Sequence, residues 1–302
     1  MSRKKILLAC LLTLLCSISL NGQNKAIKDA LGYPYIIKFP PQRIISLAPN
    51  ITEILFALGM GDRIVGITRY CDYPKETMEK EIIGGMVDPN LEKIIALNPD
   101  LVIGFRGNTL KVLERIKSLD LPLFALEMGA SLESIFPLIK KIGTITRMEK
   151  KADILTRSLR KKFTDILLAL RSVHHEPKVF LSLHGIGLWT CGKESFLNDL
   201  IRKARGVNIA GDIPRKWLHY NKEQFIHEDP EVIIILSKFQ EEFSKTKEWI
   251  TNENQFAEVK AISTGRIYFL DENLSTRPGP RLIDAFAELA RLLHPQCFEQ
   301  KR

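Results

Sequence analysis

The chain has 302 residues, of which 45% are hydrophobic and 26% charged, and its formal net charge is +9. This length allows two domains with adequate cores, and the composition is that of a globular protein. Of five cysteines, Cys10 and Cys16 precede the globular part, and the other three lack the spacing of a disulfide scaffold or a zinc knuckle. The longest basic run, residues 160–162, lies on a predicted helix and is typical of a solvated helix face. It therefore gives no support to nucleic-acid binding.

The N-terminus has the pattern of a secretory signal peptide. Three cations at positions 3–5 precede an apolar run at 6–20, which is too short to span a bilayer comfortably. We therefore expect a signal peptide over residues 1–22, cleaved near Gly22 or Gln23. A lipoprotein-like box ending at Cys10 offers a lipid anchor as a second interpretation, but cleavage there would leave an unusually short apolar core.

An internal repeat is the most informative feature of the chain. Residues 90–103 and 221–234 align without a gap at an offset of 221 − 90 = 131. Each copy opens with an asparagine suited to cap a helix, and a glutamate two positions later complements the helix dipole. Each predicted helix ends before a proline and is followed by a short apolar strand, which is typical of a strand buried on both faces of a parallel sheet.

A weaker similarity between the two halves of the chain extends beyond this repeat. Residues 43–47 form an apolar strand, and Asn50 and Glu53 are predicted to form a capping pair in the helix that follows. Residues 178–183 form a second apolar strand, followed by a helix around 194–204. Strand and helix thus alternate in both halves, which predicts an α/β fold with two parallel sheets.

The segment between the halves differs from both. Residues 144–173 contain no proline, and their apolar positions recur in steps of three and four, which predicts one long amphipathic helix of about 40 Å. We expect this backbone helix to join an N-terminal lobe at 23–143 to a C-terminal lobe at 174–302, with a ligand cleft between them. A helix that belongs wholly to one lobe is the alternative.

In open α/β sheets, ligands bind beyond the carboxyl ends of the strands. The loops expected there carry three rings, Tyr70, Trp189 and Trp217, which offer rigid amphipathic surfaces for a large flat ligand. Arg277, in a proline-containing loop, is suited to a carboxylate, amide or phosphate. Each ring taken alone is better explained as a core or lobe-packing residue, but the convergence of all three on strand-end loops favours a binding site.

Catalytic motifs are missing from the sequence. It contains no dinucleotide loop, Walker loop, nucleophile elbow or His-Glu-x-x-His pattern. A secreted α/β hydrolase that uses Ser182 is the enzymatic alternative. The run His174-His175-Glu176 precedes a proline at the end of the long helix and is interpreted as solvated linker. We therefore expect no catalysis, no resident cofactor and no metal site.

Three segments together resemble the periplasmic binding proteins of importers for cobalamin, haem and iron–siderophores, whose lobes are joined by a helical backbone. They are residues 43–59, 71–74 and 90–103, within a likeness that extends from Arg43 to Leu293. The first and third segments are shared across that family. The stretch from Tyr70 to Pro74, and Gly192-Lys-Glu-Ser195 after an aromatic residue, look most like the cobalamin branch.

The resemblance implies a set of ligand-binding residues in the cleft. Met86 falls where the cobalamin branch has a tryptophan, and Asn273 falls where it has an aspartate; a methionine can pack on a macrocycle or ligate haem iron. The residues expected to bind ligand are Tyr70, Met86, Trp189, Trp217, Arg277, Pro49 and His184.

The resemblance also implies a partner. Glu92 and Glu223 fall where the family docks a permease dimer through one surface glutamate per lobe, and both also suit a first-turn, dipole-complementing role. The expected protein is a monomeric periplasmic receptor that delivers cobalamin or a related corrinoid to an ABC importer. It would meet the membrane only through the transporter or a lipid anchor.

Two alternatives stay open at this point besides the hydrolase. One is a haem or ferric-siderophore receptor on the same scaffold, with His184, His219, Tyr70 or Met86 as candidate axial ligands. The other is an interaction protein without a small-molecule ligand. Whether Cys71 and Cys191 meet across the cleft is likewise open.

Overall fold

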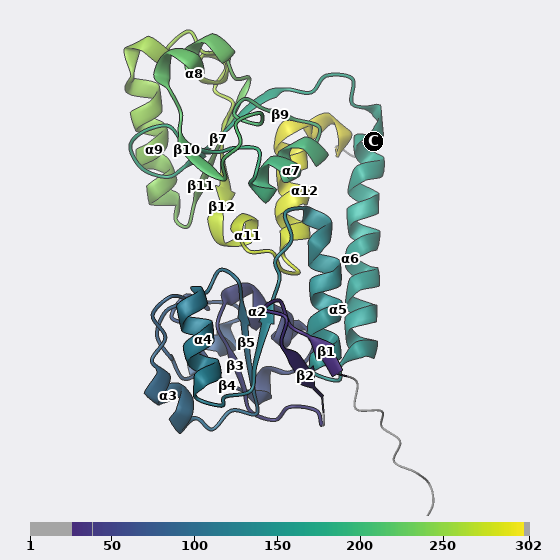
Figure 1. The fold of residues 1–302 in the computed structure, drawn as a ribbon. Helices are drawn as coiled ribbons and strands as arrows, with labels where there is room; N and C mark the ends of the chain where they lie inside the picture. Colours follow the sequence, from purple (N-terminus) through teal and green to yellow (C-terminus); the bar gives the residue numbers. More distant parts are fainter. Residues whose placement is uncertain (1–25, 38, 299–302) are drawn as a thin grey trace, which may run out of the picture.

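The computed structural model describes residues 26–37 and 39–298, so the expected signal peptide and lipid-anchor cysteine lie outside the described residues. The fold is α/β, with two lobes that are joined along one side by the helices α5 (Ile135–Ile145) and α6 (Glu149–Ala169) (Figure 1). Within the described ranges, none of the helices combines the length and apolar character needed to cross a membrane.

The N-terminal lobe contains a four-stranded parallel sheet in the order β4-β3-β5-β6. Its strands are short and apolar, so both faces are buried. Ile44 and Leu101 pack with α2 and α5 on one face, while Ile45 and Val102 pack with α3 and α4 on the other. The elements are the hairpin β1 (Ala26–Lys28) and β2 (Pro34–Ile36), then β3 (Ile44–Ser46), α2 (Pro49–Ala57), β4 (Ile64–Ile67), α3 (Leu91–Ala96), β5 (Leu101–Phe105), α4 (Leu110–Ser118) and β6 (Leu123–Leu126).

The C-terminal lobe has a mixed sheet in the order β10-β8-β7-β11-β12, with β9 also paired to β7. Strands β7, β9, β11 and β12 run parallel, whereas β8 and β10 add an antiparallel edge. One face packs against α6, α7 and α12, and the other packs against α8, α9 and α10. The elements are β7 (Lys178–Leu183), β8 (Trp189–Cys191), α7 (Phe196–Lys203), β9 (Val207–Asn208), β10 (Trp217–His219), α8 (Lys222–Glu228), β11 (Val232–Ser237), α9 (Gln240–Asn252), α10 (Lys260–Ser263), β12 (Ile267–Asp271), α11 (Glu272–Thr276) and α12 (Leu282–Leu293).

The sequence repeat is also a structural repeat. The side chain of Asn90 caps α3 by accepting from the amide of residue 93 at 2.9 Å, and Asn221 caps α8 by accepting from the amide of residue 224 at the same distance. Asn98 and Asp229 then adopt left-handed backbone, with φ of 44° and 48°. Each copy leads into an inner strand of its sheet, β5 or β11, so the repeat builds the same helix–turn–strand unit in both lobes.

Two sequence predictions about helices need correction. The capping pair in α2 is wrong, because the helix is capped at Ala48 without a side-chain bond and Asn50 and Glu53 lie inside it. The single helix over 144–173 is instead the end of α5, a turn in which Arg147 has φ of 59°, and α6. The apolar periodicity continues through the turn because both helices bury an apolar face.

The shorter α6 still connects the lobes. Ala152, near its start, belongs to the core of the N-terminal lobe, and Phe163 and Ile166 belong to the core of the C-terminal lobe. Its 21 residues correspond to a length of about 30 Å. Because one continuous helix contributes to both cores, the lobes share a rigid connection rather than a flexible linker.

Gly143 tests the packing between α5 and α6. A Cβ at this position would lie 2.4 Å from the Cβ of Ala152. In a helix interior, alanine is more favourable than glycine by about 1 kcal/mol. If Gly143→Ala nevertheless destabilises the protein, the steric clash with Ala152 must outweigh this gain. We expect a net loss of about 1–2 kcal/mol in the free energy of unfolding, measured by urea denaturation.

The matched control is Gly279→Ala, whose Cβ would meet its nearest neighbours at an ordinary 3.7 Å. It should change the free energy of unfolding by less than about 0.5 kcal/mol. Equal stability of the two variants would contradict tight packing of α6 on α5.

Candidate functional site: the cleft between the lobes

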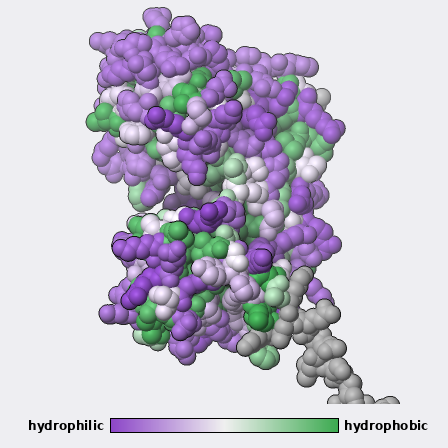
Figure 2. Space-filling view, in the orientation of Figure 1, coloured by the Kyte–Doolittle hydropathy of each residue, from purple (hydrophilic) through white to green (hydrophobic). Residues whose placement is uncertain are grey.

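The loops after the parallel strands of the two sheets meet between the lobes. After β4, the carbonyl of Tyr70 accepts from the guanidinium of Arg277 at 3.3 Å. After β6, residues 128–130 and Trp217 line a crevice of about 200 Å³ that spans both lobes. The molecular surface is hollowed between the lobes (Figure 2). The cleft therefore lies where the strand ends of both sheets face each other.

A cluster of charged groups crosses the cleft. Glu53 of α2 is only 4% exposed, and its carboxylate accepts from Arg281 at 2.6 and 2.9 Å and from Arg277 at 3.3 Å. Arg277 also donates to Asp72 at 3.1 Å and to Asn273 at 2.7 Å. Two cations of the C-terminal lobe thus meet two carboxylates of the N-terminal lobe. The guanidinium fork suits this arrangement because it holds several acceptors in one plane.

The environment of this cluster favours its charged forms. Burial disfavours ionisation of Asp72, but the hydrogen bond and charge of Arg277 outweigh it, so the pKa of Asp72 lies below its ordinary value. Burial likewise opposes the charge of Arg277, yet Asp72 and Glu53 raise the pKa of this guanidinium. The pKa of Arg281 is raised in the same way by Glu53. The surroundings therefore favour the charged forms of Asp72, Arg277 and Arg281.

Three aromatic side chains that the sequence assigns to ligand binding stay unburied. Tyr70 is 44% exposed, Trp189 47% and Trp217 39%. The sequence placed both tryptophans in loops, but they lie in the paired strands β8 and β10, where Trp217 opposes Cys191 and Trp189 opposes His219. The rings of Trp189 and His219 meet edge to face at 5.6 Å between centroids. Because directly paired residues share a face, both tryptophans lie on the same side of this two-stranded ribbon.

The other expected binding residues occupy different surroundings. Pro49 is the first residue of α2 and is buried. Met86 is half-buried, and its carbonyl accepts from the side chain of Asn108 at 2.7 Å. Asn108 also donates to the carbonyl of Leu47 at 3.1 Å, so it holds the Met86 loop beside the end of β3.

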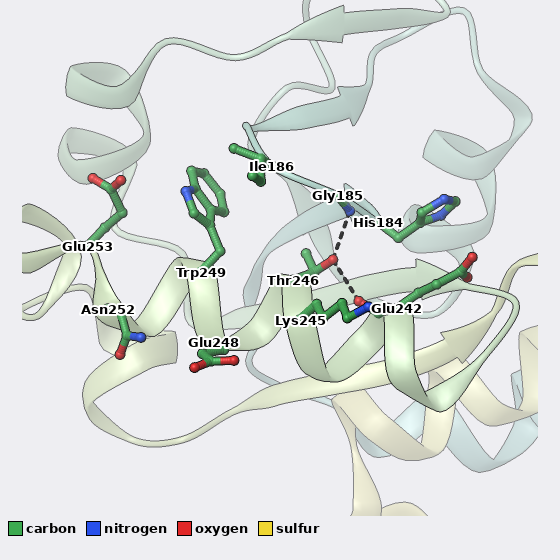
Figure 3. A pocket seen from close by; sticks show the side chains of 10 residues that line it. All are labelled: His184, Gly185, Ile186, Glu242, Lys245, Thr246, Glu248, Trp249, Asn252 and Glu253. Atoms are coloured by element: carbon green, nitrogen blue, oxygen red, sulfur yellow. Dashed lines mark hydrogen bonds between the residues drawn. The ribbon is translucent and has the colours of Figure 1, made fainter.

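His184 makes its polar contact with Glu272, the residue before Asn273. Its Nδ1 is 3.2 Å from a carboxylate oxygen of Glu272, and it lines one end of a groove of about 620 Å³ along α9 (Figure 3). In this groove the hydroxyl of Thr246 accepts from the amide of Gly185 at 2.8 Å and donates to the carbonyl of Glu242 at 2.8 Å. These bonds fix the loop after β7 to α9.

Sequence reasoning missed several residues of the cleft. Glu53 was given only a capping role, Arg281 and Asp72 were given none, and Asn108 was not considered. One signal was available: Glu53 is a carboxylate within the otherwise apolar run of a helix expected to be buried. A buried carboxylate needs a positively charged or hydrogen-bonding partner. The sequence does not indicate which distant residue is that partner.

The two cysteines near the cleft do not pair. Cys71 and Cys191 are free and buried, each in the core of its own lobe. Burial raises the pKa of Cys71, whose sulfur lies 3.2 Å from the hydroxyls of Thr52 and Thr68. Burial also raises the pKa of Cys191 to about 12. Both thiols are therefore protonated at neutral pH and unreactive.

Geometry gives little support to catalytic or metal chemistry. Ser182 is fully buried, and its hydroxyl donates to the carbonyl of Leu183 at 2.9 Å. His175, from the histidine pair before β7, contacts Glu231 at 2.7 Å on the surface. Across residues 26–37 and 39–298 there is no group of three His, Cys, Asp or Glu side chains placed to hold a metal ion.

The two expected docking glutamates are both exposed. Glu92 is in the first turn of α3 and Glu223 is in the first turn of α8, one in each lobe. In Figure 1 both helices lie on the side of their lobe away from α6. Their equivalence follows from the structural repeat.

Glu53→Gln tests whether the charged cluster stabilises the molecule. Removing the carboxylate leaves two partly buried guanidinium groups without their shared partner, and we expect a loss of about 3 kcal/mol in the free energy of unfolding by urea denaturation. Glu127→Gln is the control, since Glu127 pairs with Arg106 at 3.2 Å on the exposed surface. That change should cost less than about 1 kcal/mol. Similar losses for both variants would show that the cluster contributes no more than a surface ion pair.

Comparison with known proteins gives the family. The model of the periplasmic binding protein family matches residues 44–274. YvrC of Bacillus subtilis, an uncharacterized ABC transporter substrate-binding lipoprotein, is 31% identical over 91% of this chain and 87% of its own length. A vitamin B12-binding protein of Vibrio parahaemolyticus is 28% identical over 87% of this chain and 92% of its own length.

A solved structure of another periplasmic binding protein has a similar fold. The periplasmic haem-binding protein RhuT of Roseiflexus sp. RS-1, in its apo form, superimposes with a TM-score of 0.77 at 26% identity and covers 85% of this chain and 99% of its own. The family match includes every strand of the two lobe sheets and ends just before Arg277 and Arg281 of the cleft. The chain therefore belongs to the periplasmic binding protein family, whose members are solute-binding proteins of transporters.

Proposed function

We propose that this chain is the periplasmic receptor of an ABC importer, and that it binds cobalamin or a related corrinoid between its lobes for delivery to a permease dimer. The observation that carries this proposal is a pair of unburied rings from opposite lobes of the cleft, Tyr70 and Trp217, with Trp189 exposed on the same face of the ribbon as Trp217. Large rings left exposed at a hollow are suited to a broad, flat ligand with an apolar face. The similarity to a vitamin B12-binding protein supports the same ligand class.

The charged cluster supplies the polar part of such a site. Arg277 is held by protein acceptors, of which the Asp72 side chain is about half exposed and Glu53 is buried. A ligand amide or carboxylate can replace Asp72 on the guanidinium while Glu53 keeps the arginine in place. The amide fringe of a corrinoid presents carbonyl oxygens of this kind. Trp217 and Tyr70 would then contact the macrocycle from opposite lobes.

Haem is the second candidate ligand. The fold agrees with that of a haem-binding protein at a TM-score of 0.77, and His219 lies beside Trp189 as a candidate axial ligand. His184 suits this role less, because its ring already contacts Glu272. Absorption spectra separate the candidates: a Soret band shifted by the protein, without retention of cobalamin on gel filtration, would favour haem.

Substitution of rings from both lobes tests the binding site. Tyr70→Ala together with Trp217→Ala should weaken cyanocobalamin binding by at least about thirtyfold in calorimetry, because each lost ring contact should cost about 1 kcal/mol or more. The exposed rings contribute little to the core, so the unfolding midpoint should stay within a few degrees of that of the unsubstituted protein. Trp249→Ala, in the groove along α9, is the control and should leave binding unchanged. Unchanged affinity in the double variant would move the ligand site away from the cleft.

The exposed glutamates test the delivery step. Changing Glu92 and Glu223 to lysine reverses one charge on each lobe, so it should stop uptake through the importer while cyanocobalamin binding stays normal. The control is Glu114→Lys with Glu248→Lys, which makes the same charge change on α4 and α9. Normal uptake by the Glu92 and Glu223 variant would remove their docking role.

A further inference from the structure

Phe239 is a large apolar residue left exposed in the loop between β11 and α9. The residue is 66% exposed. Its strand, β11, lies between β7 and β12 in the sheet and runs parallel to both. The carboxyl end of β12 leads through α11 to Arg277, on the side of the C-terminal lobe that faces the N-terminal lobe (Figure 1). Because parallel strands end at the same edge of a sheet, Phe239 also lies on the cleft side of its lobe.

The position of Phe239 is unfavourable for the stability of α9. It is the N-cap residue, where a side chain that accepts a hydrogen bond from the helix is preferred, and a phenyl ring cannot accept one. Glu242 accepts from the amide of Phe239 at 3.3 Å and from that of Lys238 at 2.9 Å. This is one half of a capping box, and the other half requires serine or threonine at position 239. A residue that breaks a local rule without a structural gain indicates a functional position.

The loop of Phe239 is fixed in place, and so is the loop beside it. The two bonds to Glu242 hold the first loop. The loop after β7 is held by the amide of Gly185, which donates to α9 at 2.8 Å. In that loop Ile186 is 81% exposed between two glycines with φ of 107° and 103°. The sheet edge therefore presents two apolar side chains on ordered loops, and ordered groups lose little entropy when they bind a ligand.

This apolar edge is separate from the rings assigned to the macrocycle. Trp217 belongs to the β8–β10 ribbon, and Tyr70 belongs to the N-terminal lobe, whereas Phe239 follows an inner strand on the other side of β7. A ligand that contacts all three rings needs an apolar group in addition to the flat face of its macrocycle. A complete corrinoid has such a group, the aromatic base of its nucleotide arm. Cobinamide, which has the macrocycle without that arm, does not.

We propose that Phe239, with Ile186 beside it, contacts the aromatic base of a complete corrinoid and makes the receptor specific for corrinoids that carry one. This inference rests on the proposed function, because it requires a corrinoid in the cleft. Two aromatic rings in an offset or edge-to-face arrangement gain more than their buried area alone provides. Tyr70 and Trp217 would bind the macrocycle that all corrinoids share, and Phe239 would distinguish among them by what projects from it.

Calorimetry with cyanocobalamin and dicyanocobinamide tests this specificity. The unsubstituted protein should bind cyanocobalamin more tightly than dicyanocobinamide. Phe239→Ala should weaken cyanocobalamin binding by about fivefold and leave dicyanocobinamide binding unchanged, since only the first ligand has a base to lose contact. The control is Phe39→Ala, which removes an 80% exposed ring before β3, at the opposite edge of the other sheet, and should change neither affinity.

The outcomes separate this inference from the proposed function. Unchanged cyanocobalamin affinity in Phe239→Ala, or equal weakening of both ligands, would overturn the contact with the base while the receptor function stands. If the unsubstituted protein binds neither corrinoid, the proposed function fails and the role of Phe239 fails with it.

Phe239→Ser gives a second test, in which stability and binding change in opposite directions. Serine at the N-cap completes the capping box with Glu242, so the unfolding midpoint of the ligand-free protein should rise by about 2 °C. The same change removes the ring and should weaken cyanocobalamin binding as strongly as alanine does. A lower midpoint, or normal cyanocobalamin affinity, would contradict the role given to Phe239.

Discussion

The arrangement of the two lobes depends on a single buried carboxylate. Glu53 lies within α2 of the N-terminal lobe and accepts three hydrogen bonds from Arg277 and Arg281 of the C-terminal lobe. A carboxylate this deeply buried is tolerated only when paired and hydrogen-bonded, so the lobes cannot separate here without exposing three charges to a new environment. The side chain of Asn50, one turn earlier, adds a bond to the carbonyl of Pro278. The cleft is thus closed at its floor by polar contacts rather than by apolar packing.

The α5–α6 hairpin limits how far this contact can open. Because α6 contributes residues to both cores, the lobes cannot rotate freely about a flexible hinge. Motion is restricted to small adjustments in which the polar contacts of the cleft rearrange. Charged groups suit such a role, since their hydrogen bonds can be exchanged for bonds to a ligand without loss of the apolar core.

Much of the fold could be predicted from the sequence, because its signals are local. The repeat at residues 90–103 and 221–234 predicted the capped helices, their ends before a proline and the strands β5 and β11 that follow in both lobes. The division into lobes followed from the same pattern. The turn between α5 and α6 was missed because two antiparallel helices that bury the same side keep the apolar period across their junction.

The site was harder to predict, because its central contacts join residues far apart in the chain. Tyr70, Trp189, Trp217 and Arg277 could be chosen individually as candidates from their positions after predicted strands, and their role in binding stays a prediction. The pairing of Glu53 with Arg281 spans 228 residues, and no local pattern connects them. For the same reason the pairing of β8 with β10, which brings Trp189 and Trp217 to one face, could not be predicted: α7 and β9 separate the two strands in the chain.

The exposed residues of the ribbon formed by β8 and β10 can change with little effect on the stability of the protein. It is attached to the sheet by the hydroxyl of Thr190, which donates to the carbonyl of Leu181 at 2.6 Å, and by Asn208, which donates to the carbonyl of Cys191 at 2.9 Å. Its outer positions contribute little to either core. Mutations there can alter the shape and chemistry presented to a guest molecule at small thermodynamic expense, so related proteins could diversify their cargo while inheriting one scaffold.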